Sequence, residues 1–312
     1  MGKVRAAVVG QAINCADTSS RDAALPDFDP PPRVLLTGAT SQIGRALMPM
    51  LHAQGHRVVA LSRAEQAPED LSVEWHRVDL AEGWPDVTAC EWLISFGPMQ
   101  ALANALSTLS AAPCQWLVAT SSMSAESKRN SIVAEDRALS ASLRQAESAL
   151  ITQCERLGIG WTVLRPTMIY GLGVDENLSL IARRALQTRL FPYPKGQGLR
   201  QPVHAEDVAL AALHAMDNSS AQGKIIEIGG GERIRIDDMF RRLRDDMPVW
   251  TMPLPVPRWL MQLAGKSMPK LRGALSRVDD DLVANNHQLT MLLDVHPRGF
   301  SPDVTRWLEV KR

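Results

Sequence analysis

The chain has few tyrosines, few cysteines, no net charge and no long apolar run. Its four cysteines form no C-x-x-C pair, so we expect reduced thiols in a cytoplasmic protein and no metal site. Its 34 Lys+Arg residues balance 34 Asp+Glu residues, which argues against broad electrostatic capture of nucleic acid or an acidic membrane. No apolar stretch approaches the roughly 18 residues of a membrane-spanning helix. The first residues do not read as a signal peptide, which also favours the cytoplasm.

What is present is typical of a globular protein. Of 312 residues, 45% are hydrophobic and 22% are charged, enough for one large domain or two modest ones. Residues 1–32 read as a flexible N-terminal extension, because prolines at 26 and 30–32 break the chain and a short apolar run at 4–9 has no obvious partner strand. We therefore place the start of the folded part at Arg33.

From Arg33 the sequence alternates between strand and helix patterns. An apolar run at 34–36, a glycine turn, a helix at 42–54 and a second apolar run at 57–61 form a βαβ unit, which makes the two strands parallel. Further strands are predicted at 73–78, 91–95, 115–119 and 161–164, with a long helix at 135–157. This rhythm predicts an α/β fold with a Rossmann-like doubly wound parallel sheet. We expect a dinucleotide-binding domain at 33–165 and a smaller α/β lobe at 166–312 that partly returns to the sheet.

A phosphate-binding turn is predicted where the first strand meets the first helix, at Thr37-Gly-Ala-Thr-Ser-Gln-Ile-Gly44. Gly38 allows a tight turn, and Gly44 allows the helix to pack closely on the sheet. The N–H groups that open the helix then face a pyrophosphate. Because the glycine pattern lies inside a complete βαβ unit, it indicates a dinucleotide-binding turn. The alternative is a tight turn without a ligand.

The pattern T-G-A-T-x-x-I-G resembles the fingerprint of the extended short-chain dehydrogenase/reductases, in their epimerase/dehydratase branch. That family usually has glycine where this chain has Ser41. Leu164-Arg-Pro-x-x-x-Tyr-Gly171, Arg200-Gln-Pro-Val-His-Ala-Glu-Asp-Val-Ala209 and Ile228-Gly-Gly230 resemble later stretches of the same family. The resemblance covers about residues 33–310 and implies a bound nicotinamide dinucleotide.

The expected cofactor-binding residues lie in the glycine turn and at the ends of the second, third and fourth strands. They are Thr37, Gly38, Thr40, Ser41, Gln42, Ile43, Gly44, Arg63, Asp79, Leu80, Ser95, Phe96 and Gly97. The second strand ends in Leu61-Ser-Arg63 with no carboxylate before Glu65. An acidic residue there accepts the ribose 2′-hydroxyl of NAD, whereas an arginine accommodates the 2′-phosphate of NADP. The sequence therefore favours NADP(H), with NAD(H) as the alternative. For Asp79, the alternative to an adenine contact is a helix or turn cap.

The catalytic pair that the resemblance implies is missing. In the resembled family a Ser/Thr after the fifth strand works with a Tyr-x-x-x-Lys pair on the next helix, in which the lysine lowers the pKa of the tyrosine. Ser121 or Ser122 matches the hydroxyl residue. Glu147 resembles a helix glutamate eight residues after the tyrosine, which puts Leu139 and Leu143 at the Tyr and Lys positions. The chain contains no Tyr-x-x-x-Lys anywhere.

Three hypotheses follow from this loss. The chain binds a cofactor without the usual redox step, or Tyr170 moves into the site from its loop, or another group handles the proton. Nearby candidates for that group are Ser121, Ser122, Lys128, Glu135, Asp136 and Arg144. We rank loss or change of the ordinary chemistry first.

The substrate side is predicted in the smaller lobe. The resemblance implies that Asn177, Arg200 and Arg277 contact the diphosphate of a nucleotide-linked sugar, with ordinary structural or surface arginines as the alternative. His204 and Asp207 are expected to cap a helix and join the lobes. The expected function is a reductase or epimerase acting on a nucleotide-linked sugar or another small carbonyl compound, and a homodimer is one possible assembly. The alternative is a non-catalytic NADP(H)-binding sensor or assembly module.

Overall fold

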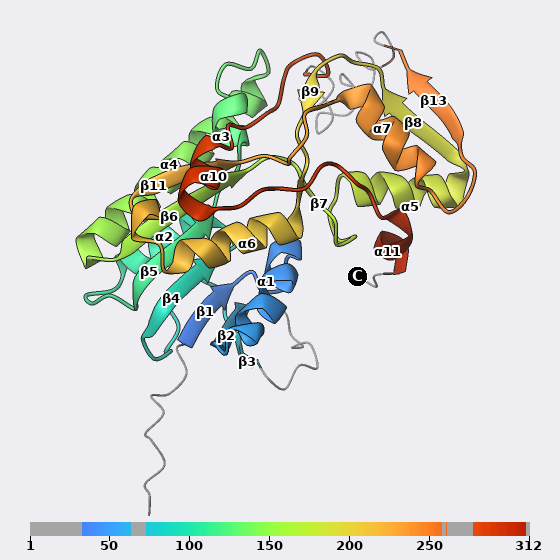
Figure 1. The fold of residues 1–312 in the computed structure, drawn as a ribbon. Coiled ribbons are helices and arrows are strands. Elements are labelled where there is room, and N and C mark those ends of the chain that lie inside the picture. The colour runs from blue at the N-terminus through green and yellow to red at the C-terminus, as the bar shows by residue number, and fades with distance from the viewer. Residues whose placement is uncertain (1–32, 64–72, 258–259, 261–276, 310–312) are drawn as a thin grey trace, which may run out of the picture. The chain divides into compact units, whose positions relative to one another are not determined.

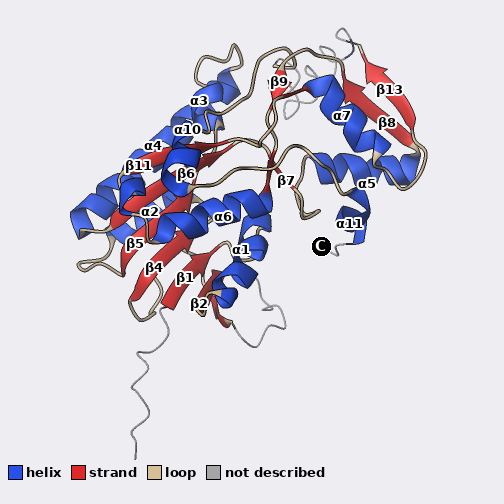
Figure 2. Ribbon diagram, in the orientation of Figure 1, coloured by secondary structure: helices blue, strands red, loops and turns tan. Residues whose placement is uncertain are grey.

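The computed structural model describes residues 33–63, 73–257, 260 and 277–309. The predicted extension at 1–32 lies outside these residues. Seven parallel strands form the central sheet in the order β11-β6-β5-β4-β1-β2-β3 (Figures 1 and 2). Their bounds are β1 Arg33–Thr37, β2 Arg57–Ser62, β3 Glu74–Arg77, β4 Cys90–Ser95, β5 Cys114–Thr120, β6 Gly160–Pro166 and β11 Lys224–Ile228. The predicted Rossmann-like sheet is confirmed.

Helices cover both faces of the sheet (Figure 2). On one face lie α1 (Gln42–Ala53), α6 (Ala205–Met216) and α10 (His287–Leu293), and on the other lie α2 (Met99–Ser107) and α4 (Ala134–Leu157). The side chains of β1 alternate between the two layers, because Val34 and Leu36 enter the α1 core whereas Leu35 enters the α4 core. A strand buried on both faces in this way explains the continuous apolar runs of the sequence.

Apart from a 3₁₀ turn that precedes β11 at its amino end, the remaining elements extend from the carboxyl ends of the strands (Figure 1). They are α3 Ser124–Ser127, β7 Ile169–Tyr170, α5 Leu178–Thr188, β8 Leu190–Pro194, β9 Leu199–Arg200, β10 Val203–His204, a 3₁₀ turn Ser219–Ala221, β12 Ile234–Arg235, α7 Ile236–Asp245, β13 Met252–Val256 and α11 Val304–Glu309. A third core joins α5, α7 and α11 around Tyr170, Phe191 and Trp307. None of the helices within the described part of the chain is long and apolar enough to cross a membrane.

Residues 298–301 are fastened to the start of α6. The Asp207 carboxylate is buried and accepts the Arg298 backbone N–H at 3.0 Å and its Nε at 3.1 Å. His204 caps the helix by accepting the Glu206 N–H through Nδ1 at 3.2 Å. His204 thus has the capping role expected from the sequence, whereas the expected joining of two lobes stays a prediction.

Tyr170 belongs to the same junction, in which residues 298–301 meet the start of α6. Its ring is fully buried and packs edge-on against His204, Phe300 and Trp307. Its hydroxyl donates to the Gly299 carbonyl at 3.3 Å and accepts the Ser301 N–H at 3.2 Å. Burial raises the pKa of this phenol. A side chain fixed at both ends in this way is a structural tyrosine, so the structure does not support its movement into a catalytic site.

The junction gives a stability prediction. Asp207→Ala should lower the free energy of unfolding by about 2 kcal/mol, because the Arg298 backbone N–H loses its partner. Glu206→Ala is the matched control, since Glu206 meets the same arginine at the surface, where an ion pair contributes about 0.5 kcal/mol. Urea unfolding of the two variants measures the difference. Equal losses would contradict the role given to Asp207.

Candidate functional site

The site is built around a point where two strand ends touch. The strand order reverses between β1 and β4, and ligands of such sheets bind in the crevice at that reversal. Gly38 follows β1 with φ +72°, and a Cβ added there would lie 2.8 Å from the carbonyl carbon of Phe96. A Cβ on Gly44 would lie 2.4 Å from the Gly38 carbonyl oxygen. Both glycines are therefore required by backbone contact.

The first turn of α1 opens at this point. Ser41 is the N-cap residue, with φ −66° and ψ 163°, and its Oγ accepts the Gly44 N–H at 3.1 Å. Serine is a preferred residue at this position because its oxygen satisfies one of the helix's free N–H groups. The departure from the usual glycine thus stabilises the helix start but occupies one of its donors.

A buried hydroxyl pair ties the two strand ends together beneath the turn. Thr37 Oγ1 lies 2.8 Å from Ser95 Oγ, and both side chains are almost completely buried. The Phe96 N–H donates to the Thr37 carbonyl at 3.0 Å. These contacts place Phe96 and Gly97 directly beside the glycine turn.

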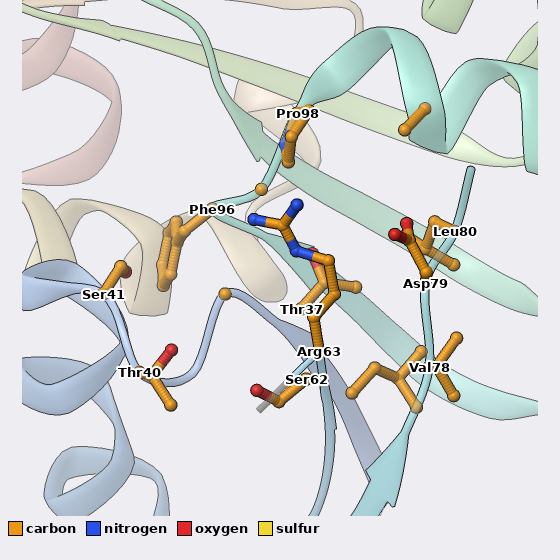
Figure 3. A pocket seen from close by; sticks show the side chains of 14 residues that line it. Thr37, Thr40, Ser41, Ser62, Arg63, Val78, Asp79, Leu80, Phe96 and Pro98 are labelled. Carbon is orange, nitrogen blue, oxygen red and sulfur yellow. The ribbon is translucent and has the colours of Figure 1, made fainter. Parts of the chain in front are cut away.

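A cavity of about 390 Å³ lies over these strand ends (Figure 3). Its lining residues are Thr37, Gly38, Thr40, Ser41, Leu61, Ser62, Arg63, Val78, Asp79, Leu80, Phe96, Gly97, Pro98 and Ala101. Nine of them were expected from the sequence. Gln42, Ile43, Gly44 and Ser95 do not line it. Ile43 packs in the core, Gly44 contacts the Gly38 backbone and Ser95 contacts Thr37. The Gln42 side chain donates instead to the Ile169 carbonyl at 3.3 Å. Of the unexpected members, Ser62, Val78 and Pro98 adjoin expected residues and Leu61 lies two residues before Arg63, so their position next to these residues was the available signal. Ala101 lies in α2, and no motif of the sequence indicated it.

Arg63 and Asp79 face the cavity from neighbouring strand ends. Figure 3 shows the exposed Arg63 side chain reaching across the cavity, with Phe96 on one side and Asp79 on the other. One Asp79 carboxylate oxygen accepts the Ala81 N–H at 3.0 Å, so this residue caps a turn. Arg63 is the cation that lines the cavity within the described part of the chain.

The two expected catalytic serines differ in their surroundings. Ser121 Oγ is shielded from solvent and has no hydrogen-bond partner among the described residues. Ser122 Oγ accepts the Ser124 N–H at 3.1 Å, which positions this oxygen. The backbone around them is held on β6, because the Ser121 N–H donates to the Leu164 carbonyl at 2.8 Å.

An ion pair fixes the position of α4 relative to β6. Arg165 Nε donates to Glu147 at 2.8 Å, and its Nη1 reaches Glu126 of α3 at 3.0 Å. The hydrogen bond with Glu147 raises the pKa of Arg165. Two turns before Glu147 stands Leu139, which is 42% exposed, and Leu143 lies between them. The helix therefore presents leucine where the register expected a Tyr–Lys pair.

The other acid/base candidates gather at the start of α4. Asp136 is buried and meets Lys128 Nζ at 2.8 Å, Arg277 Nε at 3.2 Å and Ser131 Oγ at 3.2 Å. Burial pushes the pKa of Asp136 upwards, but the hydrogen bond from Lys128 and the charges of Arg277 and Lys128 outweigh it and hold that pKa below its usual value. Glu135 is exposed, and Arg144 has a buried Nε with no hydrogen-bond partner in the described residues.

The expected substrate residues take different positions. Arg200 is buried, and its guanidinium donates to the carbonyls of Leu199, Arg277 and Asp280 at 2.9, 2.7 and 2.6 Å. Burial, together with the charge of Arg277, lowers the pKa of Arg200 to about 10. Asn177 is exposed at the start of α5. Arg200 thus holds the loop that carries Arg277.

Comparison with known proteins gives a family match over more than half of the chain. The model of the NAD dependent epimerase/dehydratase family matches residues 34–88 and 104–229. A UDP-glucose 4-epimerase of Vibrio cholerae is 27% identical over 131 residues. That alignment covers 40% of this chain and 39% of the Vibrio enzyme, so it spans less than half of either protein.

Solved structures extend the likeness to nearly the whole fold. The NAD-dependent NDP-hexosamine 5,6-dehydratase TunA, involved in tunicamycin biosynthesis, has a TM-score of 0.68 at 15% identity and covers 90% of this chain and 99% of its own. The UDP-glucuronic acid 4-epimerase of Bacillus cereus, in complex with NAD, has a TM-score of 0.66 at 14% identity, with coverages of 89% and 97%. At these identities the likeness concerns the fold.

The contact at Gly38 gives a binding prediction. Gly38→Ala should reduce dinucleotide affinity by about 100-fold, because the methyl group forces the turn away from Phe96 and displaces the N–H groups that face the ligand. Gly55→Ala is the control, since Gly55 has φ +78° but nothing within 4 Å of its added Cβ. Titration with NADPH, followed by its fluorescence, measures both. Unchanged affinity in Gly38→Ala would exclude this turn as the binding site.

Proposed function

Since this chain belongs to the NAD dependent epimerase/dehydratase family, we propose that its cavity binds a nicotinamide dinucleotide. The observation that carries the proposal is the cavity itself, which lies over the glycine turn and the start of α1. Backbone N–H groups at such a helix start favour a diphosphate. Thr37, Gly38 and Thr40 would surround that bridge, and Ser41 would close its far side.

The cofactor that we propose is NADP(H), with NAD(H) as the alternative. The support is Arg63, a permanently charged planar donor over the cavity, at the strand end where a dinucleotide site reads the adenosine ribose. Asp79 lies across from it but already accepts a backbone N–H, which fits a role as turn cap with one carboxylate oxygen left for the adenosine. Leu80 and Ala101 would supply apolar contacts to the base.

The catalytic form of the proposal is a reductase or epimerase that acts on a nucleotide-linked sugar or another small carbonyl compound. A bound nicotinamide supplies hydride transfer. Ser122 is the better of the two hydroxyls for holding the reacting oxygen, since its Oγ is positioned by the Ser124 N–H and keeps its own proton to donate, whereas Ser121 Oγ is shielded from solvent. Arg277 is the proposed contact to the diphosphate of the substrate, and its backbone carbonyl accepts a hydrogen bond from Arg200. Asn177 is a weaker candidate. A cytoplasmic location and a homodimer also stay predictions.

The second candidate is a non-catalytic NADP(H)-binding sensor or assembly module. It is favoured by the sequence at 124–160, which contains no tyrosine, and by leucine at 139 and 143. An apolar side chain cannot lower the pKa of a neighbouring group by charge. Both candidates need the cofactor cavity, so turnover separates them.

Cofactor preference is tested at Arg63. Arg63→Asp should reverse the ratio of NADPH to NADH affinity, with NADPH weakened by at least about 10-fold, because a carboxylate repels the 2′-phosphate and accepts the 2′-hydroxyl. Arg57→Asp, at the opposite end of the same strand, is the control and should leave the ratio unchanged. If the ratio in Arg63→Asp equals that of the unaltered protein, the assignment of NADP(H) is lost.

Turnover is tested with a panel of sugar nucleotides and small carbonyl compounds in the presence of NADPH or NAD. For the enzyme, Ser122→Ala should lower kcat by about 100-fold while NADPH affinity stays the same. Ser121→Ala serves as the comparison and should change kcat by less than about threefold, because its Oγ is shielded from solvent. Cofactor binding without turnover across the panel would favour the sensor or assembly module.

A further inference from the structure

The start of α1 has four backbone N–H groups that the helix itself cannot bind. Two of them are already used. The Ser41 N–H donates to the Gly38 carbonyl at 2.9 Å, and the Gly44 N–H donates to Ser41 Oγ at 3.1 Å. The N–H groups of Gln42 and Ile43 have no acceptor among the described residues. A diphosphate over this turn therefore meets two free backbone donors instead of four.

Ser41 stands where the family usually has glycine, although the backbone at this point does not require one. Its φ of −66° and ψ of 163° are ordinary extended values, in contrast to the left-handed Gly38. In dinucleotide-binding turns a glycine in the middle of the pattern lets the diphosphate approach the main chain. Serine adds a Cβ and a hydroxyl there, and these atoms keep a ligand further from the main chain.

The Ser41 hydroxyl keeps its proton available for a ligand. Its oxygen accepts the Gly44 N–H, and a hydroxyl that accepts one hydrogen bond can still donate another. Within the part of the chain that the structure describes, nothing accepts that proton. Ser41 also lines the cavity, and Figure 3 shows it at the cavity edge. The helix cap thus positions a side-chain donor where a ligand would lie.

We propose that Ser41 binds the diphosphate of the ligand through its side chain, with its hydroxyl donating to a phosphate oxygen. This hydrogen bond replaces the Gly44 N–H, which Ser41 itself occupies. The diphosphate then meets the Ser41 hydroxyl together with the N–H groups of Gln42 and Ile43. A hydrogen bond to a charged phosphate is stronger than one between neutral groups. The inference rests on the proposed dinucleotide site and assigns to Ser41 a contact that glycine cannot make.

Backbone amide resonances of the unaltered protein test this directly. Saturation with NADPH should shift the amide protons of Gln42 and Ile43 at least about twice as far as that of Gly44, because only the first two gain a charged acceptor. Nitrogen-15 NMR spectra measure the shifts. A Gly44 amide that shifts as far as the other two would overturn the inference, since the ligand would then have taken this donor from Ser41. If neither NADPH nor NADH binds, the proposed function fails together with the inference.

Substitution of Ser41 is the second arm. Ser41→Ala should weaken NADPH and NADH binding by about 10-fold each, because both ligands contain the diphosphate and the retained Cβ still keeps it from the main chain. Ser41→Thr keeps a hydroxyl that can cap and donate, so both affinities should stay within about threefold. Asn218→Ala is the control. Asn218 Oδ1 caps the 3₁₀ turn by accepting the Ser220 N–H at 3.0 Å, but this residue does not line the cavity.

Calorimetric titration measures the affinities, and urea unfolding separates binding from capping. Asn218→Ala should lower the urea midpoint and leave both affinities unchanged. If Ser41→Ala also loses only stability and binds both dinucleotides within about twofold of the unaltered protein, Ser41 is a helix cap alone. The inference then fails while the proposed function stands. A loss for one dinucleotide only would contradict a contact to the shared diphosphate. If Ser41→Ala does not fold, the amide shifts of the unaltered protein still decide.

Discussion

The close approach of Gly38 to the end of β4 is the contact on which the rest of the site depends. It requires a left-handed glycine on one strand, and the neighbouring Thr37–Ser95 hydroxyl pair joins the two strands under the turn. With these strand ends in contact, the start of α1 is brought over the reversal point of the sheet, which places its free N–H groups where the proposed diphosphate would bind. The same contact carries Phe96 and Gly97 to the edge of the cavity.

Much of this arrangement could be predicted from the sequence because it depends on local rules. Apolar runs separated by helical spacing, together with a glycine turn, are sufficient for parallel βαβ units, and strand ends in such a sheet meet at one edge. That is why residues as distant as Thr37, Arg63 and Asp79 were expected to line one cavity before any contact was known. The sequence pattern could not distinguish residues that line the cavity from residues that support the turn. Ser95 points beneath the turn towards Thr37, and Gly44 is needed for backbone packing, although both belong to the same motifs.

Arginine roles were harder to predict, because a guanidinium binds a backbone carbonyl as readily as a phosphate. Arg200 lies in a motif that implies a ligand contact, yet its donors hold the carbonyls of the loop at 277–280. The Arg277 side chain in turn meets a buried carboxylate, Asp136, which comes from a distant part of the sequence. Such pairings depend on the packing of segments that are far apart in the sequence. Composition and motif spacing carry no information about that packing.

The register of α4, the helix on which the sequence resemblance expects a Tyr–Lys pair, depends on the Arg165–Glu147 ion pair. Because the two charges meet in a nearly buried bidentate contact, α4 cannot slide along β6 without separating them, so the helix register is fixed at this point. With Glu147 in place, Leu139 and Leu143 occupy the two turns of α4 before it, and Tyr170 is buried in the junction with Gly299 and Ser301. The frame of the proposed dinucleotide site is thus held together by contacts between distant segments, and leucine stands at the two helix positions where the register of the sequence expected a Tyr–Lys pair.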